Sequence, residues 1–210
     1  MTISNSHIKH LFSAPLLRFP WKDCKDLNES LKKLILEKQE LFPSERMSNT
    51  GGWQSPKTLH TWEAPCIRQL INNINIAVLH LITECLGEEN TNSLGTWNIA
   101  AWANINEEGD YNMIHNHSGG VWSGVYYVDA GTPDPAHPFS GILTFHSPTL
   151  ASLTLDNLRA PQQLRHLFRS EYSMIPKNGL MLLFPSWLAH SVHPYFGSTP
   201  RISISWDVMF

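Results

Sequence analysis

The spacing of hydrophobic residues in the first third of the chain is helical. Leucine and isoleucine recur every three or four residues over two stretches, 26–42 and 64–87, with polar side chains between them. In the second stretch Pro65 suits the first helical turn and Gly87 suits the C-terminal cap. The pattern therefore predicts two amphipathic helices before residue 95.

From residue 96 onward the chain consists of short runs rich in β-branched and aromatic residues, separated by Gly, Pro, Asn and Asp. The candidate strands are TWNIAAWANI (96–105), VWSGVYYV (121–128), GILTF (141–145), EYSMI (171–175), LMLLF (180–184) and RISISWDVMF (201–210). The tetrapeptide PKNG (176–179) predicts a tight hairpin connection. The stretch 147–168 fits neither pattern, and its length predicts an insertion over one mouth of a barrel, with a lid as one reading.

Helices followed by a run of short strands predict an α+β chain that is mainly β. With 210 residues, the chain is long enough for one substantial core and too short for two independent domains. We expect a single domain over 1–210, in which a helical N-terminal support region (1–95) packs outside a β core (96–210). The β core is expected to be a jelly-roll or cupin-like barrel.

Composition and charge narrow the function classes. Hydrophobic residues make up 42% of the chain and charged residues 16%, which describes a folded globule rather than a disordered chain. A net charge of −3 leaves no basic surplus for nucleic acid, and no apolar run is long enough to span a membrane. The N-terminus lacks the layout of a signal peptide. Three widely spaced cysteines (Cys24, Cys66 and Cys85) argue against a disulfide framework, so we expect a reduced, cytoplasmic protein.

Two histidines, His115 and His117, stand one residue apart ahead of a predicted strand. Side chains at positions i and i+2 of an extended chain project to the same face, so the pair could bind one metal ion. The chain has 11 histidines, and the pair alone is therefore weak evidence. Additional support comes from His190, which opens an extended piece after an apolar strand, and from Arg201, which lies on the next strand with Ser203 on the same face.

Together these residues suggest a specific chemistry. Three histidines could hold Fe(II) on one side and leave the opposite side open for a bidentate cosubstrate and oxygen. Arg201 would then lie at a distance from the metal and pair with the far carboxylate of a dicarboxylic acid, with Ser203 as a second donor.

Longer motifs carry a family resemblance. They are SNTGGWQS (48–55), WANIN (102–106), HNHSGGVWSGVYYV (115–128), and GLMLLFPSWLAHSVHP (179–194) followed by RISISW (201–206). Through them the chain resembles the 2-oxoglutarate/Fe(II)-dependent oxygenase superfamily, and within it a set of bacterial and phage members related to prolyl 4-hydroxylases. The resemblance implies a double-stranded β-helix with the metal inside one end and the N-terminal helices outside.

The resemblance also implies roles, carried over residue by residue. The implied residues are His115, His117 and His190 for the iron, and Arg201, Ser203, Tyr127 and Asn104 for 2-oxoglutarate. The superfamily usually has a carboxylate where His117 stands, and we interpret the H-x-H pattern as a feature of this subfamily. The implied activity is a dioxygenase reaction that hydroxylates an unactivated C–H bond and releases succinate and CO2.

The expected substrate, by elimination, is a small molecule, an amino acid or an amino-acid side chain, with O2 as the co-reactant. No nucleic-acid or membrane partner is expected. A homodimer through the helical N-terminal half is compatible with the sequence, which does not test it.

Two other interpretations stay open. The segment GDYNMIHNH also fits the cupin spacing G-x5-H-x-H, and a three-histidine iron dioxygenase that does not use 2-oxoglutarate would suit it. Against it, the glutamate expected after His117 is missing, and such an enzyme has no need of Arg201 and Ser203. A non-catalytic binding module on the same barrel would not require intact iron ligands. Dependence on 2-oxoglutarate, measured as succinate production, separates the first interpretation from both others.

Overall fold

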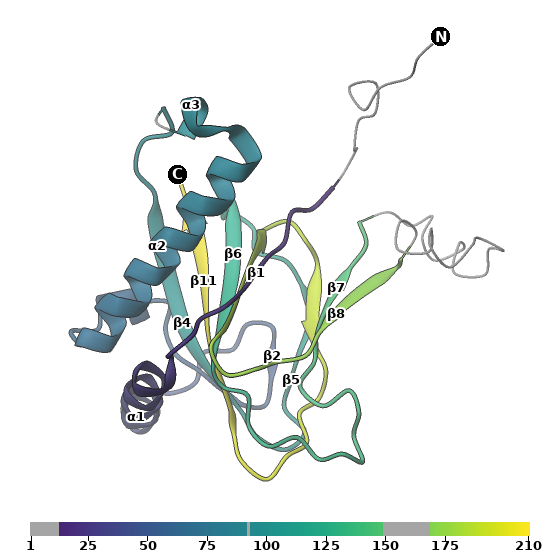
Figure 1. Ribbon diagram of the computed structural model, residues 1–210. Helices are drawn as coiled ribbons and strands as arrows, with labels where there is room; N and C mark the ends of the chain where they lie inside the picture. The colour runs from purple at the N-terminus through teal and green to yellow at the C-terminus, as the bar shows by residue number, and fades with distance from the viewer. Residues whose placement is uncertain (1–12, 92, 149–168) are drawn as a thin grey trace, which may run out of the picture.

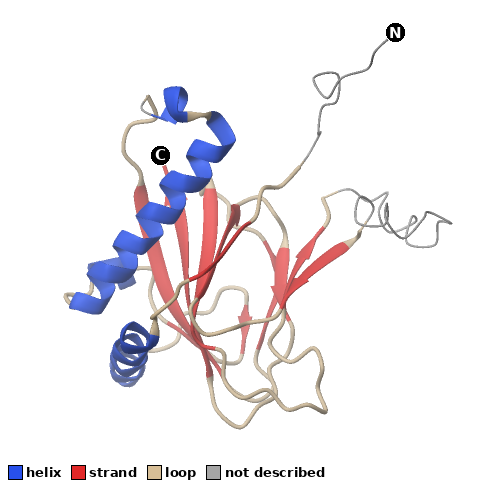
Figure 2. Ribbon diagram, in the orientation of Figure 1, coloured by secondary structure: helices blue, strands red, loops and turns tan. Residues whose placement is uncertain are grey.

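The computed structural model describes residues 13–91, 93–148 and 169–210. Two antiparallel sheets form its centre, and the helices lie on the outer side of the larger sheet (Figures 1 and 2). The expected α+β, mainly β architecture with N-terminal helices packed outside is confirmed.

The larger sheet has six strands and the smaller sheet has five. The larger sheet runs in the order β1 (Leu17–Pro20), β9 (Leu180–Pro185), β6 (Trp122–Asp129), β11 (Arg201–Met209), β4 (Asn98–Asn106) and β3 (Trp53–Gln54). The smaller sheet runs in the order β2 (Asn49–Thr50), β5 (Tyr111–His115), β10 (His190–Val192), β7 (Leu143–His146) and β8 (Glu171–Met174). From β4 to β11 the chain repeatedly crosses from one sheet to the other, which is the winding of a double-stranded β-helix.

The helices cover the larger sheet. They are α1 (Lys25–Leu41), a 3-10 turn at Leu59–Thr61, α2 (Pro65–Leu86) and the short α3 (Glu88–Thr91). Pro65 begins α2, and Gly87 ends it with φ +83° and a bond from its N–H to the Thr83 carbonyl, as the pattern predicts. The apolar faces of α1 and α2 form one hydrophobic cluster with the outward side chains of β4, β6, β9 and β11.

The alternation of side chains along the strands separates two cores. On β6, Tyr126 and Val128 point to the helices, whereas Val125 and Tyr127 point into the space between the sheets. Strand β11 follows the same rule, with Ile202, Ile204, Trp206 and Val208 on the helix side. Its other face is therefore available for polar residues.

All six strands expected after residue 96 are confirmed as β4, β6, β7, β8, β9 and β11. The prediction of a hairpin at PKNG is wrong. The segment does form a tight turn, with Gly179 at φ +77°, but the strands that flank it, β8 and β9, belong to different sheets. The turn therefore carries the chain across the β-helix instead of closing a hairpin. The expected insertion over 147–168 lies almost entirely outside the described residues.

Three strands come from the first 95 residues, where the pattern indicates helices only. Strands β2 and β3 are two residues each: β2 forms an edge of the smaller sheet beside β5, and β3 forms an edge of the larger sheet beside β4. The connection between them is Gly51–Gly52, with φ of +69° and +63°. A Cβ on Gly51 would collide with the Asp110 carboxylate, so the turn requires glycine. This turn fixes the segment that reaches the mouth of the β core.

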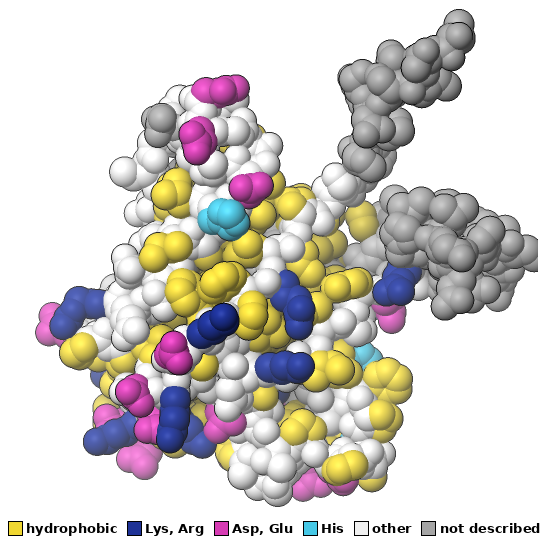
Figure 3. All heavy atoms as spheres, in the orientation of Figure 1, with side chains coloured by type: hydrophobic (Ala, Val, Ile, Leu, Met, Phe, Trp, Pro, Cys, Tyr) yellow, Lys and Arg dark blue, Asp and Glu magenta, His cyan; other side chains and the backbone are white. Residues whose placement is uncertain are grey.

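Among the described helices, none combines the length and the apolar character that a membrane span requires. Figure 3 nevertheless shows hydrophobic side chains at the surface between α2 and β1. Phe19 of β1 and Ile76 and Leu79 of α2 are exposed. They are interspersed with polar and basic residues.

Candidate functional site

Two of the three histidines, His115 and His190, face each other across a strand pair. Strands β5 and β10 are antiparallel neighbours, and His115 is paired in register with His190. The two imidazole rings have centroids 4.3 Å apart. His190 is buried at 5% exposure and packs edge-on against Phe184 of the opposite sheet.

His117 completes the group from the segment that follows β5. Its backbone N–H donates to the Ser186 carbonyl at 2.9 Å, and its ring stacks on the indole of Trp102 with centroids 5.5 Å apart. The candidate ligand atoms of His115, His117 and His190 all lie within 4.8 Å of one another. The sequence predicts that these three residues lie at one site, and the structure places them next to one another.

The second ring nitrogen of each histidine is already engaged. The Nδ1 of His115 lies 2.8 Å from the Met113 carbonyl, and the Nδ1 of His190 lies 2.9 Å from the Leu188 carbonyl. A carbonyl only accepts, so each Nδ1 carries a proton and each Nε2 keeps its lone pair. The Nε2 of His115 lies 3.3 Å from the Ser48 hydroxyl, a weak bond that a metal can replace.

The protonation states also suit metal binding. Burial, with a smaller contribution from the charge of His115, lowers the pKa of His190 to about 3. Burial likewise lowers the pKa of His115. Both rings are therefore neutral at pH 7, the form in which imidazole binds a metal.

A cavity of about 600 Å³ opens beside the three histidines. Arg201 and Ser203 line it from β11, Tyr127 from β6 and Asn104 from β4. The strand register makes Ser203 the direct neighbour of Tyr127 on one side and of Asn104 on the other. All four predicted cosubstrate residues therefore share one cavity with the histidines.

Arg201 is buried at 3% exposure. Its Nη1 donates to the Asn106 side-chain oxygen at 2.9 Å and to the Ser203 hydroxyl at 3.4 Å, and its Nε has no partner. None of the ion pairs among the described residues involves Arg201. A buried guanidinium without a counter-ion is unfavourable, which indicates that an anion belongs there.

Tyr127 provides a second unsatisfied group in the same place. Its ring lies under the Arg201 guanidinium, 5.1 Å from centroid to carbon, and its buried hydroxyl meets the distance and angle criteria for a hydrogen bond with none of the described residues. Burial raises the pKa of this hydroxyl and outweighs the opposite effect of the adjacent Arg201, so the hydroxyl stays a neutral donor. The orphaned Tyr127 hydroxyl and Arg201 Nε are the donors that a bound carboxylate would satisfy.

A carboxylate, Asp207, stands behind His117. The Nδ1 of His117 lies 2.7 Å from Asp207 Oδ1, which also accepts from the Ser123 hydroxyl at 2.8 Å, and the Nζ of Lys57 lies 3.1 Å from Asp207 Oδ2. Burial raises the pKa of Asp207, but these hydrogen bonds and the charge of Lys57 outweigh it, and the pKa lies below its ordinary value.

Sequence reasoning missed Asp207, Lys57, Asn106 and Ser48. A signal for two of them exists in the strand alternation: Asp207 is in phase with Arg201 and Ser203 on β11, and Asn106 is in phase with Asn104 on β4. Lys57 and Ser48 come from the N-terminal segment, whose approach to the site no local pattern indicates.

The family follows from a direct comparison. Residues 100–207, which include every polar residue of the site except those from the N-terminal segment, match a family model described as "Putative 2OG-Fe(II) oxygenase". The chain belongs to this family. It is an oxygenase that uses Fe(II) and 2-oxoglutarate, and the site described above has the donors for both. No curated protein matches the sequence.

Solved structures confirm the fold of this 2OG-Fe(II) oxygenase. A Pseudomonas putida prolyl-4-hydroxylase is similar with a TM-score of 0.62 and 16% identity, covering 92% of this chain and 91% of that one. A viral collagen prolyl hydroxylase from Paramecium Bursaria Chlorella virus-1, in complex with 2OG, has a TM-score of 0.58 and 13% identity, covering 92% and 94%. HygX from Streptomyces hygroscopicus, with nickel and 2-oxoglutarate bound, has a TM-score of 0.59 and 9% identity, covering 92% and 82%. The double-stranded β-helix expected from the resemblance is confirmed.

Proposed function

We propose that this 2OG-Fe(II) oxygenase binds iron through His115, His117 and His190 and anchors 2-oxoglutarate through Arg201 and Ser203. The observation that carries the proposal is the buried, unpaired guanidinium of Arg201 in the cavity that the three histidines line. A three-histidine enzyme that does not use 2-oxoglutarate would leave this charge without a purpose.

Iron and 2-oxoglutarate, once bound, would supply with O2 the oxidative decarboxylation of 2-oxoglutarate to succinate and CO2, coupled to the oxidation of a substrate C–H bond. The side chains of the cavity would position the reacting groups and exclude water. Arg201 and Ser203 would fix the far carboxylate, and the Tyr127 hydroxyl would add a third donor to it. Leu143, Phe184 and Val192 line the cavity beside the histidines and would keep water away from the reacting atoms.

We further propose that the substrate is a small, amino-acid-like molecule that carries an anionic group. Among the described residues, no carboxylate lines the cavity, although the whole chain has 18 acidic residues. Of the described cations besides Arg201, Arg46 and Lys57 line it, and Lys57 is already paired with Asp207. Hydroxylation is the expected outcome.

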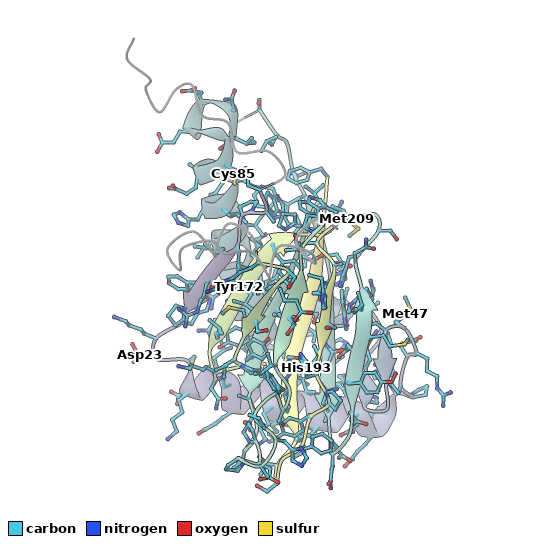
Figure 4. All side chains as sticks on the ribbon, turned by 90° about the vertical axis from the view of Figure 1, so that its right-hand side faces the viewer. Asp23, Met47, Cys85, Tyr172, His193 and Met209 are labelled. Atoms are coloured by element: carbon cyan, nitrogen blue, oxygen red, sulfur yellow. The ribbon has the colours of Figure 1, made fainter. Side chains whose placement is uncertain are left out.

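The mouth of the cavity adds an apolar element. Met47, Met113 and Ile114 line it and stay more than half exposed, at 65%, 52% and 65%. Figure 4 shows Met47 projecting into the solvent at one edge of the sheets. A substrate with an apolar part next to its anionic group would contact both these apolar side chains and the cations of the cavity. Solved neighbours include a prolyl hydroxylase in complex with a peptide fragment and HygX with hygromycin B bound, so the fold itself does not choose the substrate.

The proposed location is the cytoplasm. Cys24, Cys66 and Cys85 are all unpaired, which suits a reducing compartment where Fe(II) is also maintained.

The deciding experiment is an anaerobic titration of metal-free protein with Fe(II) and then with 2-oxoglutarate. We expect the weak visible charge-transfer band of the iron–2-oxoglutarate chelate in the wild type and its loss or weakening in Arg201→Ala. Arg46→Ala is the matched control, because it removes a cation at the mouth and should keep the band. Iron binding without a band in the wild type would contradict the 2-oxoglutarate site.

With the band established, succinate release can be screened with amino acids and with the corresponding carboxamides, which lack the negative charge of the carboxylate. Stimulation by the acids, reduced in Arg46→Ala and Lys57→Met, would support the anionic substrate. Equal stimulation by the amides would contradict it.

A further inference from the structure

The three histidines are not held alike. His115 and His190 each donate Nδ1–H to the backbone carbonyl two residues before them, Met113 and Leu188. His117 instead contacts a carboxylate, Asp207, at 2.7 Å, the shortest of the three contacts. The difference matters because a carboxylate brings a negative charge to the ring, whereas a carbonyl brings only a dipole.

Asp207 is held firmly in this position. Its side chain lies on the cavity side of β11, opposite the apolar face that packs on the helices, and the residue is buried at 6% exposure. Ser123, its direct neighbour on β6, donates to the Oδ1 that faces His117, and Lys57 binds the other oxygen. The ammonium of Lys57 also lies 4.2 Å from the centroid of Trp102, the ring on which His117 stacks.

On the proposed function given above, three neutral imidazoles would hold a dication with no negative charge among the ligands. We propose that Asp207 supplies this charge from outside the ligand set, as a positioning residue that acts through His117. A carboxylate that accepts the Nδ1 proton fixes the ring orientation and makes Nε2 a stronger donor to the metal. His117 would therefore be the strongest donor to the metal among the three histidines.

A purely structural role for Asp207 is the competing explanation. The Lys57–Asp207 pair joins the N-terminal segment to β11, and that link alone could account for the buried carboxylate. The two explanations differ in what they predict for metal binding. A structural link affects the stability of the metal-free protein, whereas an outer carboxylate affects the affinity for the metal.

The test is the dissociation constant for Co(II), measured without 2-oxoglutarate or substrate by competition with a chromophoric chelator. In Asp207→Asn, which keeps the size of the side chain and removes the charge, we expect Co(II) binding to weaken about 10- to 100-fold. Ser123→Ala, which removes one of the bonds that orient Asp207, should show a smaller loss. Lys57→Met breaks the link to the N-terminal segment and keeps the carboxylate on His117, so its affinity should stay at least as high as in the wild type.

Controls separate the possible failures. Asp129→Asn removes a different carboxylate, paired with Lys32 outside the cavity, and should leave the Co(II) affinity unchanged. If Asp207→Asn folds and binds Co(II) like the wild type, or if Lys57→Met shows the same loss, the inference is overturned. If His115→Ala and His117→Ala keep full affinity, the proposed metal site itself is wrong. Should Asp207→Asn fail to fold, the Ser123→Ala and Lys57→Met pair still decides between the two explanations.

Discussion

Arg201 and Tyr127 each have a buried polar atom whose hydrogen bonding a bound ligand would complete. A guanidinium nitrogen and a phenol hydroxyl are both buried without a hydrogen-bond partner in the described part of the chain, and both residues line the same cavity. Buried polar groups in folded proteins are nearly always satisfied, so two orphans at one place indicate a ligand. The mutations that test them should change ligand binding more than folding.

Replacement of Arg201 by methionine removes the charge and keeps an apolar stem of similar length. We expect the dissociation constant for 2-oxoglutarate to rise at least about 30-fold, because truncating a buried charge pair costs about 2 kcal/mol or more. Metal affinity should not change. Calorimetric titration of the Ni(II)-loaded protein with 2-oxoglutarate measures the effect, and an unchanged dissociation constant would refute the role of Arg201.

Tyr127→Phe should have opposite effects on the free and the bound protein. Loss of an unsatisfied buried hydroxyl should leave the metal-free protein equally stable or raise its unfolding free energy by about 1 kcal/mol. The same change removes a donor to 2-oxoglutarate, so the stabilisation by 2-oxoglutarate and Ni(II) should shrink. Thermal unfolding with and without both ligands reports the difference. A destabilised free protein would mean that the hydroxyl already has a partner.

At this scale, short sequence motifs were enough to predict which residues share a site, and their roles there stay a prediction. His115, His190 and Arg201 stand in local patterns that name a chemistry, and all three line one cavity. Asp207 stands 90 residues from His117, and its role depends on which strand lies beside β11. No local pattern carries that information, although the alternation along β11 places Asp207 on the same side of the strand as Arg201 and Ser203.

Strand β11 is an element with two separate tasks. Its residues alternate between the hydrophobic cluster under the helices and the polar wall of the cavity. It also pairs along most of its length with β4 on one side and β6 on the other. Neighbouring residues of β11 should therefore give different mutant phenotypes.

Ile204→Ala and Ser203→Ala form a matched pair on this strand. Ile204 is fully buried, and its truncation should lower the unfolding free energy by about 2–5 kcal/mol. Ser203→Ala should lower it by less than about 1 kcal/mol and weaken 2-oxoglutarate binding instead. Urea denaturation and 2-oxoglutarate titration of both variants are the measurements. Similar stability losses in the two would contradict the separation of the faces.

The Gly51–Gly52 turn can be tested by a comparison of glycines. Gly52 has φ +63°, and a Cβ there would lie 2.8 Å from the Ile105 carbonyl oxygen, whereas Gly109 has φ +85° and open space around it. Both alanine variants should lose about 1 kcal/mol for the backbone conformation. Gly52→Ala should lose about 1–3 kcal/mol more for the collision. Equal losses of unfolding free energy in the two variants would show that the turn adjusts to the added Cβ at little cost.

At the scale of elements, the long periodic segments were predictable and the short ones were not. The apolar runs of β4, β6, β9 and β11 and the helix α2 carry enough residues for a period to be visible. Strands β2 and β3 have two residues each and exist because the sheets offer them an edge. The turn at PKNG has the composition of a hairpin, but its neighbours in space are decided by the β-helix and not by the turn.

The whole molecule holds the site between its two sheets. His115 and His190 come from the smaller sheet, whereas Arg201, Ser203 and Tyr127 come from the larger one. Iron and 2-oxoglutarate, bound as proposed, would connect the two sheets to each other. Ligand binding should therefore act on global stability.

Ni(II) and 2-oxoglutarate together should raise the melting temperature more than the sum of their separate effects. A ligand at 100 times its dissociation constant stabilises a protein by about 2.7 kcal/mol, and the chelate depends on both components. A chelator should reverse the shift, and His190→Ala should abolish it. Additive shifts, or a shift by 2-oxoglutarate alone in the presence of chelator, would place the cosubstrate away from the metal.

The alternation along β11 also limits how this oxygenase can change over generations. Selection should act on the even positions 202–208 through the stability of the fold and on the odd positions 201–207 through ligand binding and catalysis. Each set of residues can therefore change without the other. A single inserted residue would exchange the two sets at once, which makes the length of this strand a stricter constraint than its composition. The mouth residues Arg46, Met47, Met113 and Ile114 belong to neither set. A new substrate could therefore be acquired there while the hydrophobic core and the iron chemistry stay as they are.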